Sequence, residues 1–157
     1  MGIIIHGKTL CAICTRTLNE EDSVVSFPHY WGNKSDPFHK FSDASCHTKC
    51  LENDNLAKQA LEHVKKMGTR PWPPPCFISG EIITDPDSFL GMGHFTDDHE
   101  HPLFPYNGAC FDRNNFKSWD KNHWLVQEIK KLAESGHWNA TALKWLAERC
   151  ETCICTG

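Results

Sequence analysis

The sequence lacks any long hydrophobic run. Its amino-terminal apolar stretch, Ile3–Ile5, is too short for the hydrophobic region of a secretory signal. No other segment approaches the roughly 20 apolar residues that a membrane-spanning helix needs. We therefore expect a soluble, cytoplasmic protein without a membrane partner.

An excess of positive charge is also missing. The chain has 16 Lys and Arg against 20 Asp and Glu, which gives a formal net charge of -4. This acidic balance provides no global attraction for nucleic acid or for an anionic membrane. Hydrophobic residues make up 39% of the 157 residues and charged residues 23%, which is typical of a folded chain. The length suits one ordinary domain or two small ones.

The cysteines do not fit a complete disulfide framework, because there are nine of them, an odd number. In the cytoplasm, thiols are kept reduced. We therefore interpret the cysteines as metal ligands and buried thiols.

The chain contains an internal repeat. When it is shifted by 65 residues it matches itself without a gap from residue 11 to residue 67. Identical matches are a minority, and most other pairs preserve apolar character, as a shared core requires. Examples are Cys11 on Cys76, Leu18 on Ile83, His29-Tyr30 on His94-Phe95, Phe41 on Tyr106, Ala44 on Ala109 and Val64–Met67 on Ile129–Leu132.

The repeat predicts the domain organisation. Between the copies lies Pro71-Trp72-Pro73-Pro74-Pro75, whose prolines favour an extended, stiff connector. We predict four segments: a first unit at 1–68, a proline-rich linker at 69–75, a second copy at 76–136, and a C-terminal helix with a Cys-rich tail at 137–157.

Each copy is predicted to contain a cysteine turn, a β hairpin, a long loop and a helix, which makes an α+β fold. In the first copy, Ile3–Ile5 and Val24–Phe27 have the composition of strands, and residues 28–45 have that of a loop. The helical spacing of apolar residues predicts a helix at 56–67, followed by Gly68. In the second copy, Asp120 could cap a helix that carries Leu125, Val126, Ile129 and Leu132 and is closed by Gly136. A third helix fits Asn139–Arg149.

Four residues of the first copy have the spacing of a metal site. Cys11-x-x-Cys14 places two thiolates on a tight turn, and His47-x-x-Cys50 places two donors on one face of a helix start. Four such ligands suit tetrahedral Zn²⁺ and leave no position for water or substrate. The sequence therefore predicts one structural zinc ion bound by Cys11, Cys14, His47 and Cys50.

Cys46 competes with His47 for the ligand role. The residue that matches Cys46 in the second copy is Phe111, which indicates an apolar position and favours His47. The second copy has Cys76, Ser79, Asp112 and Asn115 at the ligand positions, so we expect no zinc there. We expect apolar contacts to hold that copy instead, with Phe77, Phe111, Phe116 and Trp119 as candidates and Cys110 as a buried thiol.

The tail leaves two alternatives open. Cys150, Cys153 and Cys155 could bind a second zinc ion if Cys76 or a histidine supplied a fourth ligand, or they could be unliganded.

Several short segments form one motif pattern along the chain. They are Cys11-x-x-Cys14, Phe27-Pro28, Asp36-Pro37, Phe41–Ala44, His47-x-x-Cys50 and Cys76–Ile82. This pattern resembles a group of bacterial zinc-binding proteins with treble-clef fingers, which are similar in ligand layout to LIM and HNH-type fingers. The resemblance covers nearly residues 8–134 and implies two tandem treble-clef-like units, the second degenerate, plus a C-terminal helix. Some proteins of this type look like immunity proteins that bind a toxin.

No catalytic set is recognisable, so the prediction is a non-catalytic protein that binds a protein partner, of the type of an immunity protein. Its contact surfaces would be the loop Asp97–His101 and the tryptophan-rich C-terminal region. One alternative is an HNH-like metal-dependent nuclease that uses histidines and asparagines of the second copy, namely His94, His99, His101, Asn107 and Asn114. Another is a nucleic-acid-binding zinc finger, although its best basic residues, Lys65-Lys66 and Lys130-Lys131, also fit solvated helix surfaces.

Overall fold

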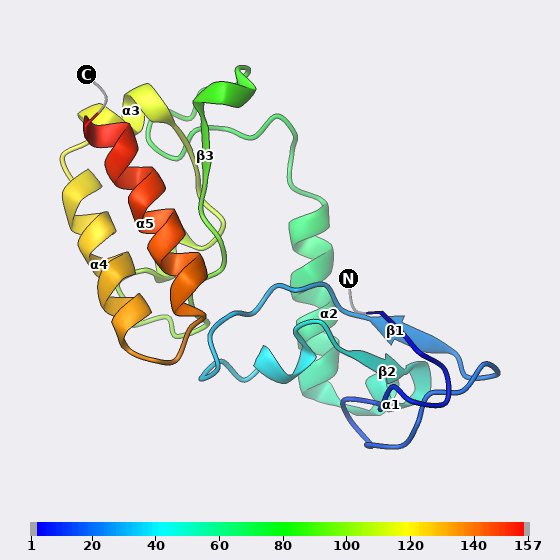
Figure 1. Cartoon of the computed structure of the whole chain (residues 1–157). Coiled ribbons are helices and arrows are strands. Elements are labelled where there is room, and N and C mark those ends of the chain that lie inside the picture. The colour runs from blue at the N-terminus through cyan, green and yellow to red at the C-terminus, as the bar shows by residue number, and fades with distance from the viewer. Residues whose placement is uncertain (1–2, 156–157) are drawn as a thin grey trace. The chain divides into compact units, whose positions relative to one another are not determined.

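The computed structural model describes residues 3–155 (Figure 1). Residues 1–2 and 156–157, the ends of the first and last predicted segments, lie outside the described residues. The chain divides into two compact units, Met1–Arg70 and Pro71–Gly157. Each contains helices and a two-stranded antiparallel sheet, so the α+β class is confirmed.

The first unit is built around a small sheet and two consecutive helices. Its elements are β1 (Val24–Ser26), the short 3-10 helix η1 (His39–Phe41), β2 (Ser45–His47), α1 (Thr48–Asn53) and α2 (Asn55–Gly68). β1 and β2 are antiparallel, with Val25 opposite Cys46.

The predicted strand Ile3–Ile5 is wrong. These residues belong to no strand, and Ile3 and Ile5 are exposed. The partner of β1 is instead β2, which lies at the end of the segment predicted as a loop. An apolar triplet forms a strand only where a neighbouring strand accepts and donates its backbone hydrogen bonds. The position beside β1 is occupied by β2, so Ile3–Ile5 has no such partner there.

The helix predicted at 56–67 is confirmed as α2, with a start one residue earlier and an end at Gly68. The Asp54 carboxylate accepts the Ala57 N–H at 2.9 Å, which caps α2 and separates it from α1. Apolar residues along one face of α2, among them Leu56, Ala60 and Val64, pack on the core of the unit.

The second unit repeats these elements and adds a long helix. Its elements are η2 (Pro86–Ser88), β3 (Phe89–Gly91), η3 (Phe104–Tyr106), β4 (Cys110–Asp112), α3 (Arg113–Ser118), α4 (Asn122–Glu134) and α5 (Ala140–Cys155). Figure 1 shows α5 lying along α4.

Two details of the predicted helices differ. Asp120 does not cap α4, which begins at Asn122 after Lys121. The third helix continues to Cys155 instead of ending at Arg149, because Cys150 and Cys153 of its last turns are buried in the core.

The two units follow the same backbone path at the 65-residue shift. The bounds of β1, η1, β2 and α1 become those of β3, η3, β4 and α3. Both strand pairs have the same register, and the positive-φ residues Thr15 and Asp43 correspond to Gly80 and Gly108. Ser42 Oγ accepts the N–H groups of Tyr30 and Trp31, and Asn107 Oδ1 accepts those of the matching Phe95 and Thr96.

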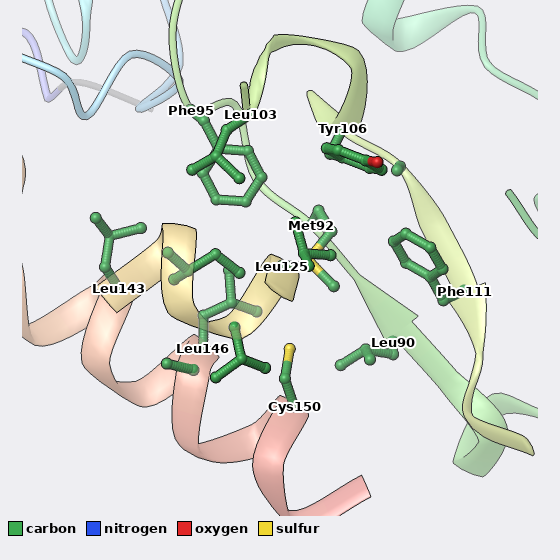
Figure 2. Packing of buried hydrophobic residues seen from close by; sticks show 14 of the residues in the cluster. Leu90, Met92, Phe95, Leu103, Tyr106, Phe111, Leu125, Leu143, Leu146 and Cys150 are labelled. Atoms are coloured by element: carbon green, nitrogen blue, oxygen red, sulfur yellow. The ribbon is translucent and has the colours of Figure 1, made fainter. Parts of the chain in front are cut away.

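The cores of the two units are unequal. Among the described residues, nine buried hydrophobic residues form the core of the first unit and 18 form that of the second. Figure 2 shows why: Leu143, Leu146 and Cys150 of α5 pack beside Leu125 of α4. Nothing comparable to α5 covers the first unit's own core within residues 3–70.

No helix within residues 3–155 has both the length and the apolar character needed to cross a bilayer.

Candidate metal centre

Cys11 and Cys14 lie on a tight turn that the backbone closes by itself. The Cys11 N–H donates to Arg16 O at 2.8 Å, and the Thr15 N–H donates to Cys11 O at 2.9 Å. Thr15 takes the left-handed conformation, with φ 58°. The N–H groups of Ile13 and Cys14 point to Cys11 Sγ, at 3.4 and 3.5 Å. The turn therefore presents the two sulfur atoms on one side.

His47 and Cys50 come from the junction between β2 and α1. His47 is the last residue of β2 and the residue before α1, whereas Cys50 lies in the first turn of α1. The sequence predicts both residues in the first turn of the helix. Cys50 lies there, but His47 lies in the preceding strand β2. The Ala12 N–H donates to Ser45 O at 3.0 Å and holds the cysteine turn against this junction.

The four predicted ligands converge. One ligand atom from each of Cys11, Cys14, His47 and Cys50 lies within 4.8 Å of the others, so that the group could hold a metal ion. His47 Nδ1 is 3.4 Å from Cys14 Sγ and 3.7 Å from Cys50 Sγ.

Asp22 orients the imidazole of His47. Its Oδ2 lies 3.4 Å from His47 Nε2, on the side of the ring away from the sulfur atoms. The same oxygen accepts the Asn19 N–H at 2.7 Å, and this hydrogen bond holds the pKa of the Asp22 carboxyl below its usual value. An ionised carboxylate on Nε2 favours the tautomer in which Nδ1 carries a lone pair towards the sulfur atoms.

The thiols of the site have unequal acidities. A hydrogen bond with Arg16 lowers the pKa of Cys14 to about 6. Burial acts to raise the pKa of Cys11, but the N–H groups of Cys14 and Ile13 outweigh it and leave that pKa lowered. Burial, and then the neighbouring Cys14 and Cys11, raise the pKa of Cys50 to about 11. Thiolates this close repel one another, and a bound cation would remove that repulsion.

Cys46 does not belong to the group. Its side chain is fully buried in the core of the first unit, and burial raises its pKa to about 12, so the thiol stays neutral. The matching residue, Phe111, is also fully buried.

The second copy has a hydrogen-bond network at the same positions. Asn115 Nδ2 donates to Ser79 Oγ at 3.1 Å and to Cys76 Sγ at 3.6 Å. The Asp112 N–H points to Cys76 Sγ at 3.4 Å. The Asp112 carboxylate caps α3 by accepting N–H groups of its first turn. The carboxamide of Asn115 therefore links the cysteine turn to α3.

Apolar contacts support that network. Of the four predicted candidates, Phe111 and Phe116 are fully buried and Trp119 is half-buried against the core. Phe77 is 46% exposed and makes its apolar contact at the edge of the core, with its ring 5.4 Å from that of Phe111. Cys110 is half-buried, not buried as predicted.

The three tail cysteines do not form a metal group. Cys150 and Cys153 face the core of the second unit, whereas Cys155 is exposed. Within residues 3–155 their sulfur atoms are not among the ligand atoms that converge. Burial raises the pKa of Cys150 to about 12, as expected for a core thiol.

The histidines and asparagines that the nuclease alternative would use make contacts within the second unit. His94 Nε2 lies 3.3 Å from Asp97, the ring of His99 lies 4.1 Å from that of Phe104, and His101 Nδ1 accepts the Leu103 N–H. Asn107 holds the start of the same loop, and Asn114 is exposed in α3. These contacts fix the loop that contains Asp97–His101.

Some side chains of the predicted nucleic-acid-binding and protein-binding surfaces make contacts within the protein itself. Lys65 pairs with Glu62, Lys130 with Glu151 and Lys131 with Glu128, which fits solvated helix faces. In the C-terminal region, Trp138 Nε1 donates to Phe95 O, whereas Trp145 is exposed and lies under Arg149.

Sequence reasoning missed Asp22 and Arg16. Neither lies at a motif spacing from the cysteines, and they reach the site only through the turn and the β1–β2 pairing.

Comparison with known protein families, with characterised proteins and with solved structures finds no match for this chain. Its function is therefore argued from the site and the surfaces themselves.

We predict that Asp22→Asn weakens zinc binding by about 10- to 100-fold, because the imidazole loses the carboxylate that orients it. Competition with a chromophoric zinc chelator measures the affinity. The matched control is Asp87→Asn, the equivalent position of the second unit, which removes the same charge. Equal affinities for the two variants would contradict the role of Asp22.

Asn115→Ala is expected to destabilise the second unit by about 1 kcal/mol, because Cys76 and Ser79 lose their common donor. Urea unfolding of the full chain, followed by tryptophan fluorescence, gives this free energy. Asn114→Ala, at an exposed neighbouring position, should have little effect. The interpretation fails if both variants unfold at the same urea concentration.

Proposed function

We propose that Cys11, Cys14, His47 and Cys50 bind one structural Zn²⁺ ion. The observation that carries this proposal is the convergence of three thiols and an imidazole nitrogen within 4.8 Å. Thiolate and imidazole donors suit Zn²⁺, whereas Mg²⁺ and Ca²⁺ prefer oxygen ligands. Four protein ligands fill a tetrahedral shell and leave no coordination position for a substrate.

The ion would replace part of a hydrophobic core. The first unit has half as many buried core residues as the second, nine against 18 among the described residues. A unit of about 70 residues is marginally stable from hydrophobic burial alone. Linking the cysteine turn to the β2–α1 junction through a metal would supply the missing stability.

We further propose that each unit is a treble-clef finger, the first with metal and the second without. This proposal is supported by the order of cysteine turn, strand pair and helix in both units, and by their equal strand registers. The Asn115 network would then take over the linking role of the ion in the second finger.

For the whole chain we propose a non-catalytic protein that binds a partner protein, of the type of an immunity protein that inhibits a toxin. A metal with four protein ligands has a structural role, and the histidines of the second unit support a loop. Residues 71–157 have 12 Asp and Glu against seven Lys and Arg, so this unit is acidic. An acidic binding protein is complementary to a basic target such as a nuclease.

Removal of zinc should unfold the first unit and leave the second folded. We predict that a strong chelator abolishes hydrogen-exchange protection in α2, while α4 and α5 keep theirs, because the second unit has its own core. Hydrogen–deuterium exchange on the full chain measures both units at once. Retained protection of α2 without metal would contradict a structural role for the ion.

The binding function predicts a stoichiometric partner. The tagged full chain, purified from its source cells, should retain one partner protein through washing at moderate salt, whereas an unrelated tagged protein of similar charge should not. Absence of such a partner would count against the proposal. Metal-dependent DNA cleavage that is lost in His94→Ala would favour the nuclease instead.

A further inference from the structure

Three aromatic rings surround the ring of Tyr106 at the margin of the second unit's core. The ring of Tyr106 lies 5.3 Å from that of Phe77, 5.9 Å from Trp119 and 5.9 Å from Trp124, measured between centroids. They come from the cysteine turn, η3, the end of α3 and α4. Figure 2 shows Tyr106 beside Phe111, at the edge of the buried cluster. We call these four residues the aromatic face.

The aromatic face is partly open to solvent. Phe77 is 46% exposed, Trp124 is 40% exposed and Trp119 is half-buried, whereas Tyr106 is buried between them. Scattered exposed apolar side chains are ordinary, but these three partly exposed rings all contact the same tyrosine, and clustered apolar groups of this kind mark binding sites. Tyr and Trp are also the residues that most often carry binding energy in protein interfaces.

The first unit provides an internal comparison. At the positions of Phe77, Trp119 and Trp124 it has Ala12, Asp54 and Gln59, on the same backbone path. Gln59 is exposed on α2, so this fold does not require a ring at that position. The rings of Phe77 and Trp119 contact Phe111 and help the core. Trp124 contacts Tyr106 and is 40% exposed.

One carboxylate adjoins the aromatic face, and the second unit as a whole is acidic. Asp120 directly follows Trp119 in the chain. Burial, and then the charge of Asp120, raise the pKa of Tyr106. Residues 71–157 have a formal net charge of -5, against +1 for residues 1–70. Aromatic rings attract cations on their faces, and a nearby carboxylate strengthens that attraction.

We propose that the aromatic face is a docking surface for a protein segment in which arginine side chains alternate with apolar ones. Apolar side chains would cover Phe77 and Trp124, and a guanidinium group would stack on a ring within reach of Asp120. This inference rests on the proposed protein-binding function and names the surface and the chemistry of the partner.

The test uses the full chain and a defined probe, the capped peptide acetyl-Leu-Arg-Leu-Arg-amide. Titration followed by NMR should shift the indole N–H signals of Trp119 and Trp124 in a saturable manner, and leave that of Trp145, exposed on α5, unchanged. The same peptide with citrulline in place of arginine has no charge and should bind about fivefold more weakly.

Two substitutions, Phe77→Ala and Trp124→Gln, replace residues of the aromatic face with the residues found at the equivalent positions of the first unit. Because the first unit has these residues on the same backbone, both variants should stay folded, which the remaining amide spectrum checks. Each should weaken binding of the arginine peptide, observed at Trp119, by about fivefold. Trp145→Ala should leave binding unchanged.

Several results would overturn the inference. These are the absence of a saturable shift, equal binding of the citrulline peptide, or a self-association that the two substitutions abolish, which would make the occupant a second copy. If a partner captured from cells binds Phe77→Ala and Trp124→Gln as tightly as the original chain, the docking surface is wrong while the protein-binding function stands. If the peptide binds selectively but no partner is captured from cells, the docking surface stands and the protein-binding function is not supported.

Discussion

The attachment of a cysteine turn to the start of a helix is the constraint on which each unit depends. In both units the turn donates one backbone hydrogen bond to the strand before that helix, from Ala12 to Ser45 and from Phe77 to Cys110. One such bond contributes only about 1 kcal/mol, so side chains must complete the attachment. The two copies achieve this with different chemistry on the same backbone.

In the first unit, potential metal ligands join the turn to the helix start. Three thiols and one imidazole meet at a point, Asp22 orients the imidazole, and Arg16 lowers the pKa of Cys14. Such a cluster of sulfur atoms is unfavourable without a cation and stable with one. In the second unit Asn115 bridges Cys76 and Ser79, while Phe111 and α5 enlarge the core. The larger core gives this unit more hydrophobic stabilisation of its own, and its turn presents the partly exposed Phe77 to solvent.

The parts of this structure that the sequence predicts are those that depend on local spacing. The C-x-x-C and H-x-x-C motifs predict the four converging residues, and apolar periodicity predicts α2. The 65-residue match predicts that the two units share one backbone arrangement, and their equal registers agree with it. The choice of His47 over Cys46 was available from Phe111, because equivalent positions of a repeat share their burial.

The features that the sequence does not predict correctly depend on tertiary contacts. Ser45–His47 has polar residues and gave no strand signal, yet it pairs with β1, whereas the apolar Ile3–Ile5 has no strand partner. The apolar spacing of Leu143, Trp145 and Leu146 does not show that α5 continues past Arg149, because the core role of Cys150 and Cys153 depends on packing with the rest of the second unit. Asp22 reaches His47 only through the fold, which no motif spacing encodes.

X-ray absorption spectroscopy at the zinc edge of the purified full chain tests the central claim most directly. The account predicts one zinc ion per chain with three sulfur neighbours at about 2.3 Å and one nitrogen neighbour at about 2.0 Å. Four sulfur neighbours would mean that Cys46 replaces His47 and that the arrangement of β2 is wrong. A shell of oxygen neighbours, or a protein that folds fully without binding zinc, would contradict the structural metal site itself.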